Sequence, residues 1–190
     1  MRYNRKTGWI SGIDHCSSSN QDDRPENTEI DLLVIHGISL PPGQYGGNYI
    51  DQLFTNSLDP LEHFFFKEIC DLKVSSHFLI RRTGEVVQYV PLTKRAWHAG
   101  VSEFKGRSCC NDFSIGIELE GCDDKFYEDV QYTRLAALTR LIQQHWPQIN
   151  ADNIVGHCDI SPGRKTDPGL AFDWKHYRNL LKEGDINSKE

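Results

Sequence analysis

In the segment Phe113-Ser114-Ile115-Gly116-Ile117-Glu118-Leu119-Glu120, large apolar side chains alternate with polar or small ones. A period of two is typical of a β-strand, because successive side chains of a strand point to opposite faces. We expect the apolar face to pack under a helix and the other face to meet a pocket or water. The apolar face carries Phe113, Ile115, Ile117 and Leu119, and the other carries Ser114, Gly116, Glu118 and Glu120.

Patterns on both sides of this strand predict further strands and helices. The apolar run 30–35 predicts a buried central strand that ends at His36. Residues 75–81 and 86–90 flank Arg82-Thr83-Gly84-Glu85 and predict a β-hairpin, with a positive φ at Gly84. A helical stripe runs through 129–146. A last helix is expected to begin at Asp173 as its N-cap and to close at Gly184.

These elements indicate one mixed α/β domain, a central mixed β-sheet flanked by helices. A chain of 190 residues with 38% hydrophobic content is large enough for one core. Residues 1–29 are polar and rich in turn formers, and predict an irregular N-terminal arm. Residues 185–190 are expected to be a frayed tail. The single domain therefore spans 1–190.

The charge and hydropathy of the chain argue against several classes of partner. The net charge is −6, which disfavours nucleic-acid binding because phosphate contacts need a basic surface. No apolar run approaches the ~20 residues of a membrane span. The first ten residues carry basic side chains without an apolar segment behind them, so no signal peptide is expected. We therefore expect a cytoplasmic protein, with a monomer as the default.

The six cysteines do not form a C-x-x-C pair, so a thiolate zinc knuckle is not expected. An even number of cysteines would suit disulfides in a secreted protein. In the absence of a secretion signal, reduced thiols are the preferred interpretation.

A turn-rich run near the C-terminus, His157-Cys158-Asp159-Ile160-Ser161-Pro162-Gly163-Arg164-Lys165-Thr166-Asp167-Pro168-Gly169, carries an imidazole, an ammonium and a carboxylate. Its prolines and glycines disfavour a regular helix or central strand. Together with His36, it suggests one zinc ion held by His36, His157 and Asp167, with an open position for water. The alternative for His36 is a packed or hydrogen-bonded histidine.

Two further residues are candidates for catalysis. Glu118, on the polar face of its strand, would act as a general base beside such an ion; the alternative is a solvated edge residue. Lys165 would stabilise an oxyanion; the alternative is an ordinary exposed lysine. For Glu120 we favour a surface or hydrogen-bonding role.

The segment Trp97-His98-Ala99-Gly100 is a candidate binding wall. The indole of Trp97 would stack on a sugar or peptide face, and a core tryptophan is the equal alternative.

Several long segments occur in the order found in one known family. The chain resembles the zinc-dependent N-acetylmuramoyl-L-alanine amidases of type 2, and most closely their AmpD-type, cytoplasmic 1,6-anhydro-muramoyl subgroup from Gram-negative bacteria. The resemblance covers most of the chain, from about Gly8 to Tyr177. The matching segments are 34–43, 79–91, 95–102, 110–121 and 156–169.

The resemblance implies the same metal ligands, with Glu118 and Lys165 at the catalytic positions. It also implies a sheet-and-helix fold shared with peptidoglycan recognition proteins. The reaction would hydrolyse the amide between anhydro-N-acetylmuramic acid and L-alanine of a muropeptide. The role would be cell-wall recycling, which also restrains β-lactamase induction where that circuit exists.

Four positions depart from the family pattern: Gly37 replaces a usual asparagine, Phe65 a frequent tyrosine, and Lys73 and Cys109 arginines. Trp97, His98 and Lys73 are the substrate-binding candidates. A lysine cannot reproduce the bidentate carboxylate contact of an arginine, so these departures bear on how the substrate is recognised.

Three rival functions remain. A binding module of the same fold would hold muropeptide without cutting it, but retention of the three ligands and Glu118 argues for catalysis. An exported amidase would need an export signal. A structural zinc site would lack the open fourth position.

Overall fold

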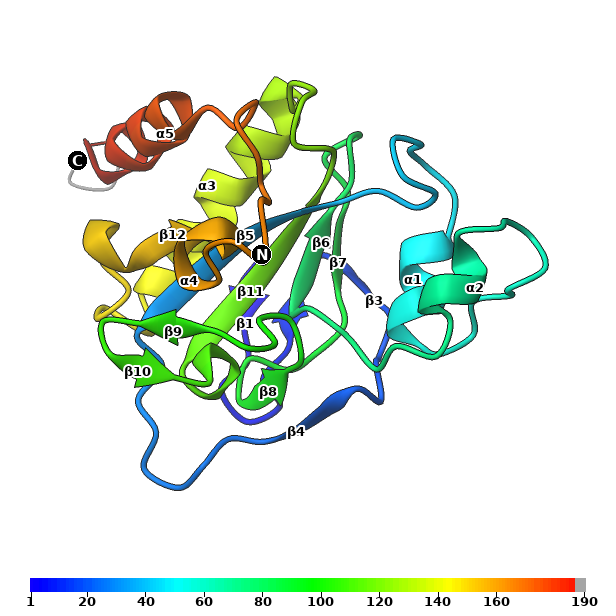
Figure 1. The fold of residues 1–190 in the computed structure, drawn as a ribbon. Helices are drawn as coiled ribbons and strands as arrows, with labels where there is room; N and C mark the ends of the chain where they lie inside the picture. The colour runs from blue at the N-terminus through cyan, green and yellow to red at the C-terminus, as the bar shows by residue number, and fades with distance from the viewer. Residues whose placement is uncertain (187–190) are drawn as a thin grey trace.

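A six-stranded sheet forms the centre of the molecule in the computed structural model, which describes residues 1–186 (Figure 1). The strands lie in the order β12-β5-β11-β6-β7-β3. The first four are mutually parallel, β7 runs antiparallel to β6, and β3 is parallel to β7. These strands are β3 (Asp14–His15), β5 (Leu32–Ile38), β6 (Phe78–Ile80), β7 (Val86–Gln88), β11 (Ser114–Glu120) and β12 (Ile154–Gly156).

The two longest strands, β5 and β11, lie side by side in the middle of the sheet. Residues 32–35 of β5 are completely buried, as a near-continuous apolar run in a parallel sheet requires. The register of the pair places Glu118 beside His36. Both side chains therefore point to the same face of the sheet, near the carboxyl ends of the two strands.

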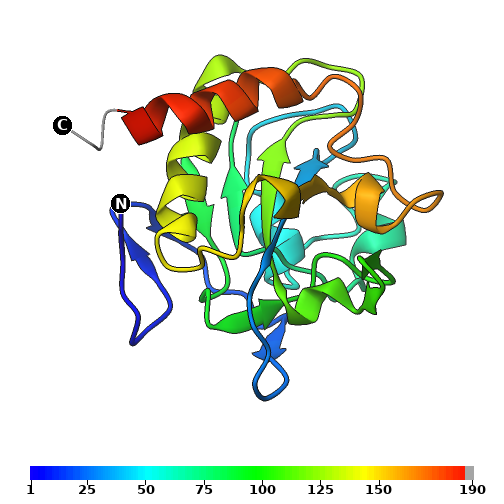
Figure 2. The same cartoon turned by 90° about the vertical axis from the view of Figure 1, so that its left-hand side faces the viewer.

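One face of the sheet is covered by α3 (Asp129–Gln143) and α5 (Trp174–Ile186), which pack against each other (Figures 1 and 2). Ile115, Ile117 and Leu119 of β11 share a core cluster with buried residues of α3. This confirms for Ile115, Ile117 and Leu119 the prediction that the apolar face of the strand packs under a helix. Phe113, predicted on the same face, lies before β11 and packs in a different cluster with Leu32 and Val34. Asp173 caps α5, since its Oδ1 accepts a hydrogen bond from the backbone N–H of His176 at 2.8 Å.

The opposite face meets two short helices, α1 (Tyr49–Phe54) and α2 (Phe66–Ile69), which lie on the right in Figure 1. They form a second core with Leu79, Val87 and Tyr89 from the β6–β7 hairpin. The hairpin itself is as predicted, with Gly84 at φ +83° in its turn. A third cluster lies under the 3-10 turn η1 (Cys110–Asp112) and the helical turn α4 (His157–Ile160).

Three expectations need correction. The N-terminal segment 1–29 is not wholly irregular: it contains four short strands, of which β3 joins the main sheet. Residues 157–160 form one helical turn, because the constraints of proline and glycine begin only at Pro162. Helix α5 continues through Gly184 to Ile186, since one glycine costs a helix only about 1 kcal/mol. The expected frayed tail, 185–190, otherwise lies outside the described residues.

The remaining strands form two-stranded sheets at the periphery. No helix within residues 1–186 is long and apolar enough to cross a membrane, and the six cysteines are free thiols. The peripheral strands are β1 (Arg2–Tyr3) with β2 (Ile10–Ser11), β4 (Gln21–Asp23) with β8 (Lys94–Ala96), and β9 (Glu103–Phe104) with β10 (Arg107–Ser108).

Candidate metal centre

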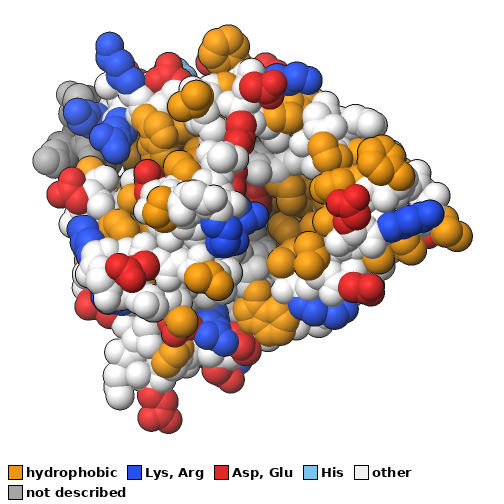
Figure 3. Space-filling view, in the orientation of Figure 1, with side chains coloured by type: hydrophobic (Ala, Val, Ile, Leu, Met, Phe, Trp, Pro, Cys, Tyr) orange, Lys and Arg blue, Asp and Glu red, His pale blue; other side chains and the backbone are white. Residues whose placement is uncertain are grey.

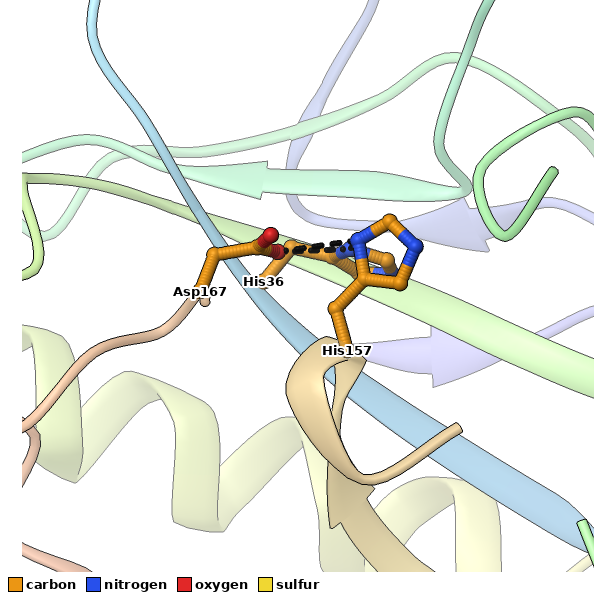
Figure 4. A group of neighbouring side chains, drawn as sticks. All are labelled: His36, His157 and Asp167. Atoms are coloured by element: carbon orange, nitrogen blue, oxygen red, sulfur yellow. Dashed lines mark hydrogen bonds and ion pairs between the residues drawn. The ribbon is translucent and has the colours of Figure 1, made fainter. Parts of the chain in front are cut away.

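Three side chains from three different elements converge in one place (Figure 4). His36 comes from β5, His157 from the first position of α4, and Asp167 from the loop that follows α4. His36 Nδ1 lies 3.0 Å from His157 Nδ1, and each of these nitrogens lies 3.1 Å from Asp167 Oδ2. Residues up to 131 positions apart in the sequence thus place three donor atoms around one point.

The donor set fits a zinc ion. Two imidazole nitrogens and one carboxylate oxygen are typical zinc ligands, and three protein ligands leave one position open. A tetrahedral zinc ion with bonds of about 2.0–2.2 Å keeps its ligand atoms roughly 3.3–3.6 Å apart. The separations of 3.0–3.1 Å are only slightly shorter than this. Among residues 1–186, this is the one cluster of three such side chains close enough to share an ion.

The electrostatics of the triad favour the forms that bind metal. Burial lowers the pKa of His36 to about 4, so this imidazole is neutral at neutral pH. Burial alone would raise the pKa of Asp167, but hydrogen bonds with His157 and His36 hold it well below its usual range. A neutral imidazole and an ionised carboxylate are the protonation states that metal ligands need.

Glu118 stands next to this triad with one oxygen unpaired. Its Oε1 lies 4.0 Å from His36 Nδ1, and its side chain is only 12% exposed. Its Oε2 is buried and has no hydrogen-bond partner among the described residues. Burial, reinforced by the negative charge of Asp167, raises the pKa of Glu118 well above its ordinary value, and Lys165 partly opposes this. Such an unsatisfied buried carboxylate is a strong proton acceptor.

Lys165 is exposed at the rim of the same site. The turn after α4 holds its backbone, because the N–H groups of Arg164 and Lys165 both donate to the carbonyl of Ser161. The positive charge of Lys165 acts on the pKa of both His36 and Glu118, which places the ammonium within electrostatic reach of the triad.

A cavity of about 320 Å³ opens beside the triad. Figure 3 shows the hollow, with hydrophobic side chains gathered along it. Its polar side includes Glu118, His157, Lys165 and Asp167, and its apolar side is built mainly from α1, α2 and their neighbours. The apolar residues include Leu40, Leu53, Phe54, Phe65, Ile69 and Leu72.

The three substrate-binding candidates occupy different positions. Trp97 is partly buried and lines the cavity. His98 reaches the cavity with a largely buried ring, 9% exposed, whose Nδ1 lies 2.9 Å from His36 Nε2. Lys73 is exposed outside the cavity lining, where its Nζ donates to Asn56 Oδ1 at 3.2 Å.

The structure also explains one departure from the family pattern. A Cβ at Gly37 would lie 2.3 Å from the hydroxyl of Tyr127, which donates to the carbonyl of Pro168. Tyr127 therefore fills the space that a side chain at position 37 would need. Spacing gave no signal for Tyr127, or for Asn111, whose Oδ1 accepts from the backbone N–H groups of His98 and Ala99.

Comparison with known proteins identifies relatives of this chain. A family model described as N-acetylmuramoyl-L-alanine amidase matches residues 26–170. The 1,6-anhydro-N-acetylmuramyl-L-alanine amidase AmpD of Escherichia coli strain K12 is 57% identical over 176 residues, which cover 93% of this chain and 96% of that protein.

Solved structures show the same fold. A crystal structure of a selenomethionine derivative of AmpD matches with a TM-score of 0.92 at 53% identity, covering 95% of this chain and 99% of its own. The amidase AmiD of Escherichia coli, in complex with the substrate anhydro-N-acetylmuramic acid-L-Ala-D-gamma-Glu-L-Lys, matches with a TM-score of 0.59 at 29% identity, covering 83% of this chain and 60% of its own.

Proposed function

This chain belongs to the N-acetylmuramoyl-L-alanine amidase family, and on that premise we propose that it is a zinc-dependent amidase of muropeptides. The bond cleaved joins N-acetylmuramic acid, in its 1,6-anhydro form, to L-alanine of the stem peptide. The observation that carries the proposal is a buried carboxylate oxygen of Glu118 without a partner, beside three convergent metal donors.

The roles of the metal-binding residues follow from their contacts. His36, His157 and Asp167 would hold the ion. Zinc bound there supplies Lewis-acid polarisation of the scissile carbonyl and a coordinated water of lowered pKa. Two of these side chains, His36 and His157, are almost fully buried.

Glu118 and Lys165 would complete the reaction. Glu118 accepts the proton of the attacking water, a role that suits a carboxylate with a raised pKa. It then returns this proton to the departing amine of L-alanine. Lys165 places its positive charge where the carbonyl oxygen becomes negative, and so stabilises the tetrahedral state.

The cavity supports a substrate with polar and apolar parts. The scissile amide would lie on the polar side, at the triad. Trp97 would stack on the sugar or the peptide. His98, which lines the cavity, would meet the substrate only through its ring carbons, since both of its nitrogens are paired within the protein. Lys73, outside the cavity lining, is the third candidate for substrate contact. The anhydro form of the sugar is supported by the relatives, since the name of AmpD and the ligand of AmiD both specify it.

The wider role follows from the substrate. We place the activity in the cytoplasm, in the recycling of wall fragments, by a protein that acts as a monomer. Removal of anhydro-muropeptides would also limit β-lactamase induction in a cell that has this circuit.

Mass spectrometry of products tests the proposal. The protein is incubated with anhydro-muropeptide and, separately, with intact sacculi, each with and without a chelator. We expect free anhydro-muramic acid and peptide from the soluble substrate, and loss of both with chelator. A protein that retains the substrate but releases no product would be a binding module.

A variant series ties the reaction to the triad. Asp167→Ala should lose bound zinc and amidase activity together, because two imidazoles alone hold the ion weakly. Cys158→Ser is the matched control, since Cys158 adjoins His157 but lies outside the triad. Full activity of a zinc-free Asp167→Ala variant would reject the mechanism.

A further inference from the structure

In both histidine ligands, the ring nitrogen that is not part of the triad, Nε2, contacts one of two adjacent residues, His98 and Ala99. His36 Nε2 lies 2.9 Å from His98 Nδ1, and His157 Nε2 lies 3.1 Å from the carbonyl oxygen of Ala99. We propose that His98, on a backbone held by Asn111, is the positioning residue of the metal centre: it accepts a hydrogen bond from His36 Nε2–H and keeps His36 Nδ1 free for the ion. The inference rests on the proposed zinc site.

The hydrogen bonds behind His36 have only one consistent direction. A His36 that binds an ion through Nδ1 carries its hydrogen on Nε2, so His98 Nδ1 must accept. The hydrogen of His98 is then on Nε2, which lies 3.0 Å from Ser114 Oγ. The Ser114 hydroxyl in turn donates to the carbonyl of Cys110 at 2.5 Å. Each of these hydrogen-bonding groups therefore has a partner, and the partner of each histidine fixes its tautomer.

The fold holds His98 in this place from two sides. Asn111 Oδ1 accepts from the N–H of His98 at 3.1 Å and from the N–H of Ala99 at 2.8 Å. The ring lies over Gly116 of β11, where a Cβ would come within 2.6 Å of His98 Cγ. One side-chain amide therefore fixes the backbone that supports both histidine ligands.

These contacts leave the His98 ring without a free polar atom. One nitrogen accepts from His36 and the other donates to Ser114, so the ring has no donor or acceptor to offer a substrate. Its contribution to catalysis is to orient a ligand. Groups that orient metal ligands in this way typically change metal affinity by 10- to 100-fold when they are replaced.

Two substitutions of His98 distinguish its hydrogen bond with His36 from its hydrogen bond with Ser114. In His98→Asn, the carboxamide lies where Nδ1 lies in histidine, and its oxygen can accept from His36. In His98→Gln, the carboxamide reaches the position of Nε2, so the link to Ser114 is kept and the link to His36 is lost. Zinc dissociation constants, measured by chelator competition on the full chain, should rise by about 10- to 100-fold in His98→Gln and much less in His98→Asn.

Unfolding of the chelator-treated variants is the control for folding. Unchanged zinc affinity in His98→Gln, or an equal loss in both variants at equal stability of their metal-free forms, would overturn the inference. Activity is not needed for either readout.

A measurement on the unmodified protein avoids variants altogether. In the zinc-loaded, ¹⁵N-histidine-labelled chain, NMR should report His36 and His98 as neutral rings that carry hydrogen on Nε2. Hydrogen on Nδ1 of His98 in the zinc-bound protein would overturn the inference alone. A wild-type chain that binds no zinc would overturn the proposed function and this inference together.

Discussion

Two glutamates two residues apart on β11, Glu118 and Glu120, share a face of the same strand but are treated in opposite ways. Glu120 is 2% exposed, and its oxygens accept from the backbone N–H groups of Gly46 and Arg82. Glu118 is similarly enclosed, yet its Oε2 has no partner within the described chain. The Glu120 carboxylate is hydrogen-bonded within the protein, whereas an oxygen of the Glu118 carboxylate is free to accept a proton.

The difference between the two glutamates indicates that one contributes to the stability of the fold and the other to the proposed reaction. Glu120 links the loop after β5 to the β6–β7 turn, because Gly46 and Arg82 belong to these two segments. Glu118 makes no comparable link, and its negative charge is unfavourable until a cation lies beside it. The same residue type thus stabilises the native state at one position and is held at a cost for catalysis at the other.

The largest effect is expected from Glu118→Gln. An amide cannot accept the proton of water, so turnover should fall by about 10²- to 10⁴-fold. Zinc content should be unchanged, because Glu118 is outside the triad. Steady-state rates and metal analysis of the same sample give the comparison, and wild-type rates would remove Glu118 from the role of base.

Glu120→Gln should show the converse pattern. One of the two backbone donors would face the NH₂ group of the new amide, and an unsatisfied buried donor costs about 1–3 kcal/mol. Denaturant unfolding of the metal-free protein should show this loss, with turnover of the folded enzyme close to wild type. If turnover instead fell as far as in Glu118→Gln, the distinction between the two glutamates would not hold.

A third position on this face, Gly116, sharpens the comparison. Gly116→Ala places a methyl group 2.6 Å from the His98 ring, and such overpacking costs about 1–3 kcal/mol. We expect lower stability and weaker zinc binding together, because the displaced ring contacts His36. Gly106→Ala is not a fair control because its φ is +78°; Ser108→Ala, on the exposed strand β10, is one. Loss of stability with wild-type zinc affinity would show that His98 can move without disturbing the ligand.

The smallest effect is the pH dependence of the metal-free protein. The pKa of Glu118 is higher in the folded state than in the unfolded one, chiefly through burial. Its protonation therefore favours folding below the unfolded pKa, and this contribution is lost as pH rises through the folded pKa. Metal-free Glu118→Gln should gain stability relative to wild type as pH rises. Unfolding in chelator at several pH values checks this, and parallel curves for the two proteins would contradict it.

The parts predicted from sequence are those with a long, regular pattern. The alternation of β11 gave the strand and both of its faces, and the helical stripe gave α3 with Leu135 and Ile142 in the core. The turn-rich run and His36 suggested the ligand set, the family resemblance implied the same set, and the three side chains do lie together. Strands of two residues such as β3 are too short to show a period, so their place in the sheet was not predictable.

The contacts that His98 and Asn111 make around the metal ligands could not be predicted from the sequence, for another reason. His98 was predicted only as a substrate contact; it does line the cavity, and its ring also spans from His36 to Ser114, which was not predicted. That placement depends on which strands are neighbours and on the space over Gly116, and neither is encoded in local spacing. The role of Asn111 depends on the same three-dimensional arrangement.

The pairing of β5 with β11 places Glu118 on the rung of His36, and this has a consequence for any preparation of the protein. The distance between Glu118 and His36 is set by the register of two hydrogen-bonded strands and not by the conformation of a flexible loop. A slip of one rung would turn Leu119 toward the ion and Glu118 away from it, because neighbouring side chains point to opposite sides. Molecules with the wrong strand register would then lack the base at the metal site. The specific activity of a refolded preparation would therefore report the fraction of molecules with the correct register.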